Sequence, residues 1–592
     1  MLFKELAEYY EKLEAVSSRL AMIDIMSELL KKAKHDEIGH VVYITQGILA
    51  PPFEGVEFGM AEKMVEEAIG IATGFTKEEV EKEYKKTGDM GKAAQNITGK
   101  SKLRRMSSKE FTVNEVYDTM RKIAATSGSG SKDIKVKLLA NLVAASTPLE
   151  AKYIVKYPLD ELRLGVGDST ILEALSIVAK GDRSLKDELE TAYNLNSDLG
   201  AIAEASIAGG EKTAKGFGLT LFKPIRPELA ERLPTAEEIL EKMGGKAAVD
   251  QKYDGFRVQA HKKGDKVKLF SRRLEDTTAM YPDLVEAIQK EVHAESVIID
   301  GEALAYNEAT NEFLPFQATI QRKRKHGLEK KIEEMPLKLF AFDIMYLNGK
   351  NMMNEPYHKR REELDKLLKN GKTIVTAGSI IAKTPKELED YFRQSIAAGL
   401  EGIVAKDLNS TYVAGARKFS WIKLKRSYRG ELSDTLDLVI VGYYLGRGMR
   451  REFNFGGLLC ATYNEERDIF ETVSRIGSGF SEKQMVELRD ALEKTKSKSK
   501  PARVDSVVEP DVWVTPRYVV TVKADEITKS PMHTCGKEDD VGYALRFPRL
   551  VSEPGSGAIR RDKSVEEATT TKEVIEMYRQ QKHVSLGKAG EE

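Results

Sequence analysis

One lysine of the chain stands in a setting that suits nucleophilic chemistry. Lys252 precedes an Asp254-Gly255 turn signal, Arg257 follows it, and apolar or β-prone residues flank both sides. This pattern predicts that Lys252 lies at a strand end or in a loop that lines a cleft. An amine attacks a phosphorus or carbonyl centre only when it is neutral, whereas a lysine with the ordinary pKa of about 10.4 is almost wholly charged at neutral pH. Burial or neighbouring cations would therefore have to favour the uncharged amine.

An isolated K-x-D-G sequence is more often a surface turn, but further short motifs follow Lys252 along the chain. They are Ser271-Arg272, Asp300-Gly301-Glu302, Phe342-Asp343, Glu401-Gly402-Ile403-Val404-Ala405-Lys406 and Lys423-Leu424-Lys425. In this order the set resembles the nucleotidyltransferase motifs of ATP-dependent DNA ligases, most closely those of archaeal replicative ligases and related eukaryotic enzymes. One such motif is a weak signal, whereas the whole series in the family's order is specific.

The resemblance implies an activity. Lys252 would attack the α-phosphorus of ATP, expel pyrophosphate and form a covalent lysyl-AMP. The AMP would pass to the 5′-phosphate of a nick in duplex DNA, and the 3′-hydroxyl would displace it to seal the strand, in replication, recombination and repair. Covalent catalysis suits this task because it stores the activated phosphoanhydride on the protein until a nick arrives.

The resemblance also implies which residues contact the nucleotide. These are Asp250, Arg257, Arg272, Glu302, Phe342, Arg417, Lys423 and Lys425. The aromatic ring would stack on the adenine, the arginines would grip ribose or phosphate oxygens with their guanidinium forks, and the two lysines would hold the phosphates. Glu302 and Glu401 would be the metal ligands, because carboxylates are hard oxygen ligands that suit Mg²⁺, with Mn²⁺ as an alternative.

Contacts with DNA or pyrophosphate are expected from a second group, namely Phe316, Arg546, Arg549, Arg561 and Lys563. Phe316 aligns with an aromatic that wedges into the minor groove beside the nick, and Leu550 stands where some relatives carry a second aromatic. The basic residues belong to the final motif of the family. Its two pieces are further apart here, across Pro554-Gly555-Ser556-Gly557, than in the family's usual arrangement.

Three regions must position these residues. Up to about residue 215, apolar residues recur at helical spacing, and from about 225 to 425 short β-rich runs alternate with helices. Beyond about 430 the chain is β-rich again, which fits a small oligonucleotide-binding barrel. The prediction is a multidomain protein with an all-α N-terminal DNA-binding domain (1–220), an α+β nucleotidyltransferase or adenylation domain (221–428), and a C-terminal β-barrel (OB-fold) domain with a terminal helix (429–592).

Two strands carry much of the expected chemistry. The run 297–299 is a buried-strand pattern that continues into Asp300 and Glu302. In 421–425 the period of two places Lys423 and Lys425 on one face. Two like charges on one strand face repel each other unless a polyanion lies between them, which a triphosphate would supply.

Two loops of small residues, 127–132 and 164–170, each precede a helical run. Backbone N–H groups at a helix start suit a phosphate oxygen, although an ordinary helix connection would show the same residues. By resemblance, the helical domain would hold the minor groove of DNA through such backbone contacts rather than by reading bases.

Composition excludes several classes of protein. The 592 residues, 41% apolar and 31% charged, indicate a globular protein of about three or four domains. No apolar run approaches about 20 residues, and the first residues lack a signal-peptide layout, so neither a membrane span nor secretion is expected. The two cysteines, Cys460 and Cys535, lack metal-ligand spacing and predict a reducing cytoplasm. No Walker-type phosphate loop or ordered Rossmann fingerprint occurs, which argues against a P-loop ATPase.

Partners and alternatives remain open from the sequence. Nicked double-stranded DNA is the expected partner of a monomer, although a net charge of zero argues mildly against nucleic acid. A sliding clamp is a second candidate, but residues 102–108 lack the paired aromatics of some relatives. The alternatives are an RNA ligase or a capping-type nucleotidyltransferase, which share the lysine chemistry, and a non-catalytic DNA-end binding module. Whether NAD or ADP can replace ATP is also left open.

Overall fold

The structure is a computed structural model that describes residues 1–16, 18–103, 110–162, 164–307, 312–313, 336–425, 435–446, 455–552 and 557–586. The side chains of 210–215, 307, 312–313, 417 and 580–586 are not described. Phe316 therefore lies outside the described residues, and Arg417 is described by its backbone alone. The chain divides into two compact units. The first holds Met1–Glu231, Tyr253–Ser379 and Lys406–Trp421, and the second holds Arg232–Lys252, Ile380–Ala405 and Ile422–Glu592.

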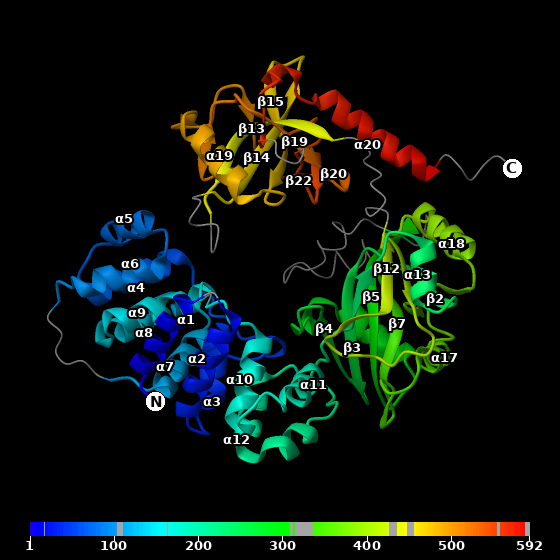
Figure 1. Cartoon of the computed structure of the whole chain (residues 1–592), viewed down its shortest axis with the longest axis horizontal. Helices are drawn as coiled ribbons and strands as arrows, with labels where there is room; N and C mark the ends of the chain where they lie inside the picture. Colours follow the sequence, from blue (N-terminus) through cyan, green and yellow to red (C-terminus); the bar gives the residue numbers. More distant parts are fainter. Residues whose placement is uncertain are drawn as a thin grey trace. The chain divides into compact units, whose positions relative to one another are not determined.

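The N-terminal region is built from helices, drawn in blue to cyan in Figure 1. They are α1 (Phe3–Glu14), α2 (Arg19–Lys32), α3 (Ile38–Gln46), α4 (Glu62–Thr73), α5 (Lys77–Thr87), α6 (Met90–Gly99), α7 (Val113–Ala125), α8 (Ser131–Ala145), α9 (Pro148–Lys156), α10 (Asp168–Lys180), α11 (Lys186–Asn196) and α12 (Leu199–Gly216). Capping boxes such as Thr112 with Glu115 satisfy the free N–H groups at helix starts. The apolar stripes of these helices pack into one core that includes Tyr10, Leu13 and Val143.

A seven-stranded sheet in the first unit carries the D-G-E and F-D motifs. Its strands are β3 (Phe256–Lys263), β4 (Lys266–Ser271), β5 (Ser296–Asn307), β6 (Glu312–Phe313), β7 (Leu337–Leu347), β8 (Lys350–Asn351) and β9 (Ile374–Thr376). The main order is β4-β3-β5-β7-β8, with β6 beside β5 and β9 beside β7. Helices α14 (Pro282–Glu291) and α17 (Tyr357–Leu367) pack their apolar residues against the core of this sheet.

A five-stranded sheet carries the nucleophile motif and the last lysine motif. Its order is β1-β12-β11-β2-β10, formed by β1 (Leu229–Arg232), β2 (Ala247–Lys252), β10 (Ser379–Ala382), β11 (Gly402–Lys406) and β12 (Arg417–Lys425). Helices α13 (Ala236–Lys242) and α18 (Pro385–Ala397) join the buried side chains of these strands in one core. Ile422 and Leu424 are fully buried in that core, and Lys423 and Lys425 alternate with them, as the period of two predicts.

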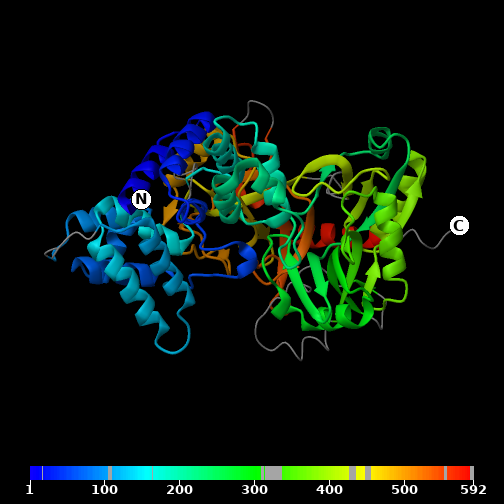
Figure 2. The ribbon, with the colours of Figure 1, turned by 90° about the horizontal axis from the view of Figure 1, so that it is seen from below.

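The C-terminal region consists mostly of strands. They are β13 (Leu436–Tyr444), β14 (Gly457–Asn464), β15 (Ile469–Ile476), β16 (Lys496–Ser497), β17 (Val504–Asp505), β18 (Val512–Val514), β19 (Val519–Lys523), β20 (Glu526–Ser530), β21 (Gly542–Arg546), β22 (Arg549–Leu550) and β23 (Ile559–Arg560). Two helices accompany them, α19 (Glu482–Glu493) and the terminal α20 (Thr571–Leu586). In Figure 2 arrows appear in the green to red part of the ribbon, and the blue to cyan part is drawn as helices.

The fold class predicted from the sequence is confirmed. A helical N-terminal part, a central α+β part and a mostly-strand C-terminal part follow one another along the chain. Within the described ranges, no helix is both long and apolar enough to span a membrane.

Candidate functional site

Two lysines from separate strands share one carboxylate in the second unit. Lys252 ends β2 and Lys425 ends β12, and each forms an ion pair with Glu401, which directly precedes β11. The backbone N–H of Glu401 also donates to the carbonyl oxygen of Lys252 at 2.9 Å. The three side chains are 22–23% exposed, so the cluster is partly buried but open to a ligand. Burial alone would raise the pKa of Glu401, but the two lysines hold it below the ordinary value.

A glycine lets these strand ends approach one another. Gly402 has a φ of +150°, and a Cβ atom there would lie 2.1 Å from the carbonyl oxygen of Leu424 and 3.0 Å from the Cα of Lys425. Such separations are far inside van der Waals contact, and both obstacles are backbone atoms. The position therefore needs glycine so that Glu401 and Lys425 can meet.

Replacing Gly402 with alanine is expected to push β12 away and separate the two residues. We expect a loss of about 1–3 kcal/mol of stability, and a lower rate of the self-adenylation that the sequence predicts, because overpacking displaces the backbone that carries Lys425. Thermal unfolding and label transfer from ATP would measure the two effects. Gly477→Ala is the matched control, since a Cβ there meets nothing within 4 Å. Equal behaviour of the two variants would contradict this account of the strand packing.

Arg257 is held rigidly in the first unit. It lies on β3 opposite Glu302 of β5, and its Nε and Nη2 donate to the two carboxylate oxygens of Asp300 at 3.0 and 2.6 Å. Burial alone would lower the pKa of Arg257, but Asp300 more than offsets this and raises it. The pair is a bidentate, charge-assisted contact, and it fixes the plane of the guanidinium group.

Aromatic rings surround that guanidinium group. Its central carbon lies 5.3 Å from the ring centre of Phe342 and 5.9 Å from that of Trp421. Lys406 adds a second cation, which lies 4.2 Å from the Trp421 ring and donates to the carbonyl oxygen of Phe342 at 2.9 Å. The buried indole Nε1 of Trp421 has no hydrogen-bond partner among the described residues. The cluster thus offers an aromatic face, fixed positive charge and an unsatisfied donor, which together suit a nucleotide.

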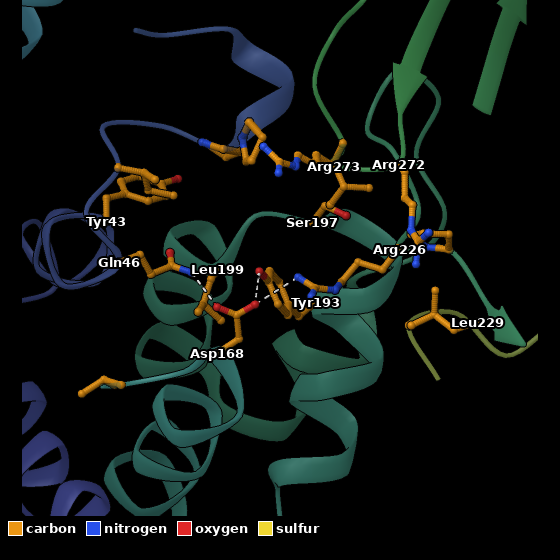
Figure 3. A pocket seen from close by; sticks show the side chains of 17 residues that line it. Tyr43, Gln46, Asp168, Tyr193, Ser197, Leu199, Arg226, Leu229, Arg272 and Arg273 are labelled. Carbon is orange, nitrogen blue, oxygen red and sulfur yellow. Dashed lines mark hydrogen bonds and ion pairs between the residues drawn. The ribbon is translucent and has the colours of Figure 1, made fainter. Parts of the chain in front are cut away.

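The remaining predicted nucleotide contacts lie on β2, on β12 and beside a cavity of the first unit. Asp250 is buried on β2, and Lys423 is half-buried on β12. Arg272 is exposed and lines a cavity of about 480 Å³ in the first unit, together with Arg226 and Arg273. Figure 3 shows this cavity, where the Asp168 carboxylate binds Gln46, Tyr193 and Arg226.

The same aspartate bears on one of the two predicted phosphate loops. Asp168 is the first residue of α10, so the positive end of this helix already carries a carboxylate. The other loop ends at Gly130, which caps α8 in a left-handed conformation (φ 77°). Phosphate binding at either helix start stays a prediction.

The basic residues of the final motif have acidic partners in the second unit. Arg546 pairs with Glu526 at 2.7 Å, Arg549 with Asp525 at 3.0 Å, and Lys563 with Asp437 at 2.6 Å. Arg561 is largely exposed, and its Nη2 lies 3.7 Å from Glu487. These arginines and this lysine therefore have to exchange acidic partners if they are to bind phosphates.

Family models and a full-length relative match most of the chain. Three family models match, described as DNA ligase N terminus (residues 2–176), ATP dependent DNA ligase domain (227–425) and ATP dependent DNA ligase C terminal region (451–554). A probable DNA ligase of Dictyoglomus turgidum is 47% identical over 583 residues, 98% of both chains. The chain belongs to the ATP-dependent DNA ligase family. Its activity is therefore nick sealing driven by ATP, and the RNA ligase, capping and non-catalytic alternatives are not favoured.

Archaeal relatives match the ligase over nearly the whole of both chains. The DNA ligase of Sulfolobus acidocaldarius is 42% identical over 98% of both chains, and that of Nitrosopumilus maritimus is 41% identical over 100% of both. Among solved structures, one titled Pmar-Lig_PreS3 covers 93% of this chain and 99% of its own, with a TM-score of 0.56 and 18% identity. At that identity the likeness shows the fold alone.

An exposed aromatic of the ligase was not predicted from its sequence. Leu550, which stands where some relatives carry a second aromatic, is 4% exposed and packs in the core of the C-terminal region. Phe547, three residues earlier, is 64% exposed and adopts a left-handed backbone (φ 51°) in the turn between β21 and β22. A bulky residue rarely adopts this conformation, so the turn presents the ring outward at some cost. The run of aromatic and basic residues at 546–549 was the available signal.

Three buried residues that support Arg257 were also not predicted from the sequence of the ligase. Asp300 was noted as a strand residue but was given no role, and Glu228 and Tyr412 lie outside every motif. Each is fully or almost fully buried and hydrogen-bonded within the first unit. No spacing rule marks a buried polar residue whose partners are distant in sequence.

Proposed function

We propose that Lys252 is the nucleophile of this ligase and that Lys425 and Lys423 bind the phosphates of ATP. The observation that supports the proposal is the convergence of Lys252 and Lys425 on Glu401. A single carboxylate balances only one of the two ammonium charges, so the cluster attracts a polyanion. A bound triphosphate would compete with Glu401 for Lys425, and Lys252, which is partly exposed, would release its proton to water and attack. A bond forms between Nζ and the α-phosphorus, and the bond to the leaving pyrophosphate breaks.

The ribose and the adenine of the nucleotide would contact Arg257 and its neighbours. Arg257 and Glu302 are paired across β3 and β5, where they would contact the ribose side, and Phe342 would stack on the adenine. Asp250, Arg272 and Arg417 are proposed as further nucleotide contacts. Asp300 keeps the guanidinium of Arg257 in one orientation, so this contact would cost little entropy on binding.

A divalent ion fits the acidic residues present. Mg²⁺ in phosphate sites is usually held by one or two carboxylates together with phosphate oxygens, so no dedicated cluster is required. The described residues contain no group of three or more potential ligands, and Glu302 and Glu401 are the proposed protein ligands of Mg²⁺ or Mn²⁺. When bound, the ion would neutralise charge that develops on the phosphates.

The partner we propose is a nicked DNA duplex, bound by a monomer. Arg546, Arg549, Arg561 and Lys563 would contact DNA or pyrophosphate after leaving their acidic partners, and Phe316 would contact the minor groove. The proposed limits of the helical, adenylation and OB-fold domains are near residues 220 and 428. A sliding clamp is a second candidate partner for which residues 102–108 show no paired aromatics, and a clamp pull-down would test it.

Phe547→Ala is expected to weaken DNA binding without unfolding the ligase. Loss of the exposed ring should raise the Kd for a nicked duplex about tenfold, the scale of one aromatic contact with a base, and leave Tm unchanged. Leu550→Ala should do the reverse, because it opens a cavity in the core and leaves the exposed ring in place. Fluorescence anisotropy and thermal unfolding of both variants would check this. Wild-type affinity of Phe547→Ala would rule out a DNA contact by this ring.

The direct test of the proposed function follows the label from ATP. The ligase is incubated with α-labelled ATP, denatured and digested, and we expect the label on the peptide that contains Lys252. Addition of nicked duplex DNA should move the label to the DNA 5′-end and release AMP as the nick closes. A label on any other lysine would reject the assignment.

A further inference from the structure

The segment that leaves the helical region reaches the guanidinium group of Arg257. Glu228 lies in this segment, one residue before β1, and its side chain is fully buried. Its backbone carbonyl oxygen accepts a hydrogen bond from Nη1 of Arg257 at 2.9 Å. The guanidinium is therefore held on two sides, by the Asp300 carboxylate and by the backbone of Glu228.

These contacts form a closed cycle of hydrogen bonds through four residues. The Tyr412 hydroxyl accepts from the backbone N–H of Glu228 at 3.0 Å and donates to Oδ2 of Asp300 at 3.3 Å. Asp300 in turn accepts from Arg257, and Arg257 donates back to Glu228. All four residues are buried or nearly so, where hydrogen bonds reinforce one another and an unpaired group is costly.

The carboxyl group of Glu228 connects this cycle of hydrogen bonds to the segment 413–420. Oε2 accepts from the backbone N–H of Val413 at 3.0 Å, and Oε1 accepts from the hydroxyl of Ser420 at 2.7 Å. Val413 directly follows Tyr412, and Ser420 lies on β12. The side chain thus fixes the register in which Glu228 faces Tyr412 and Arg257.

The segment is also anchored on its other side within the first unit. The backbone N–H of Arg226 donates to the carbonyl oxygen of Asn194 at 2.8 Å, and its guanidinium binds Asp168 at 3.1 Å. Gly415 and Leu229 add backbone bonds between this segment and the 413–416 stretch. Residues 226–229 are therefore immobilised at both ends, as a positioning element requires.

We infer that Glu228 is a positioning residue for ATP binding, which acts by holding Arg257 and Tyr412 in the orientation that the nucleotide meets. The inference rests on the proposed contact between Arg257 and ATP. Glu228 itself touches no reacting atom. Its removal should therefore weaken nucleotide binding more than it slows the chemical step at saturating ATP.

The test compares two substitutions of Glu228 in the full-length ligase. Glu228→Ala removes both carboxylate bonds and should raise the KM for ATP in self-adenylation about tenfold, with a smaller change in the rate at saturation. Glu228→Gln has the same length, can still accept from Val413 and can donate to Ser420, so its KM should stay within about twofold of wild type. If Glu228→Ala does not fold, Ser420→Ala removes one of the two bonds and should raise the KM about threefold.

A matched control separates positioning from stability. Glu471 is a buried carboxylate of the C-terminal region. It accepts hydrogen bonds from the backbone N–H of Gly536 and from the hydroxyl of Thr571. Glu471→Ala should lower Tm and leave the KM for ATP unchanged. The inference is overturned if Glu228→Ala, or Ser420→Ala in its place, changes the KM no more than Glu471→Ala does, or if Glu228→Gln is as impaired as Glu228→Ala.

Arg257→Ala distinguishes a failure of the positioning role of Glu228 from a failure of the proposed contact between Arg257 and ATP. A raised KM in Arg257→Ala with a normal KM in Glu228→Ala rejects the inference alone. A normal KM in Arg257→Ala rejects the proposed nucleotide contact, and the inference with it.

Discussion

Lys252→Arg is expected to abolish self-adenylation while the ligase stays folded. A guanidinium group keeps the positive charge that Glu401 binds, but it stays protonated in proteins and cannot attack phosphorus. The rate of label transfer from ATP should fall by at least about 10³-fold, as expected when a covalent nucleophile is removed. Acid-quenched incubation with α-labelled ATP measures this rate.

Two controls define this result. Lys425→Arg keeps a cation that cannot replace the nucleophile but can still bind phosphate, so it should retain measurable labelling. A nick that already carries AMP on its 5′-phosphate should still be sealed by Lys252→Arg. Lysyl-AMP is needed only to place AMP on the 5′-phosphate, which precedes sealing. Labelling of Lys252→Arg at the wild-type rate would show that another residue is the nucleophile.

Asp343→Ala is expected to cause the largest loss of stability among these variants. Asp343 and Arg360 are both completely buried, and the guanidinium donates to the two carboxylate oxygens at 2.8 and 2.9 Å. Removing the aspartate leaves an uncompensated charge in the interior, which costs about 3–5 kcal/mol. Hydrogen exchange at the amides of β7 and α17 would report the local loss.

A double substitution identifies the cause of that loss. Asp343→Ala combined with Arg360→Met removes both charges, so it should recover part of the stability that the single variant loses. A cost below about 1 kcal/mol for Asp343→Ala would contradict this, because that is the range of exposed ion pairs. The aspartate of the F-D motif would then need a different role.

The fold class and the order of the motifs could be predicted from the sequence because both rest on local patterns. Helical spacing before residue 215 and the period of two in 421–425 are visible in short windows, and both agree with the structure. The resemblance supplied the candidate residues in the same way, as short strings in a fixed order. It named Lys252 and Glu401 separately, as nucleophile and metal ligand.

The pairing of those residues could not be read from the sequence. Lys252 and Glu401 are 149 positions apart and meet only because β2 and β11 are placed in one sheet. Glu228 and Tyr412 are 184 positions apart, and a buried glutamate looks like a surface residue until its partners are known. The outward turn at Phe547 depends on a backbone conformation that residue type does not encode. Tertiary hydrogen bonds and strained turns are the part that local patterns miss.

The shared carboxylate has a consequence for the order of events after catalysis. Two ammonium groups around Glu401 leave one positive charge in excess while the enzyme waits for nucleotide. With Lys252 as the nucleophile, attachment of AMP would replace its ammonium charge by a neutral nitrogen bonded to the anionic phosphate of AMP, which would remove that excess at the moment when pyrophosphate is made. The cluster should then let its by-product depart, so the reaction itself would weaken the grip on the departing group.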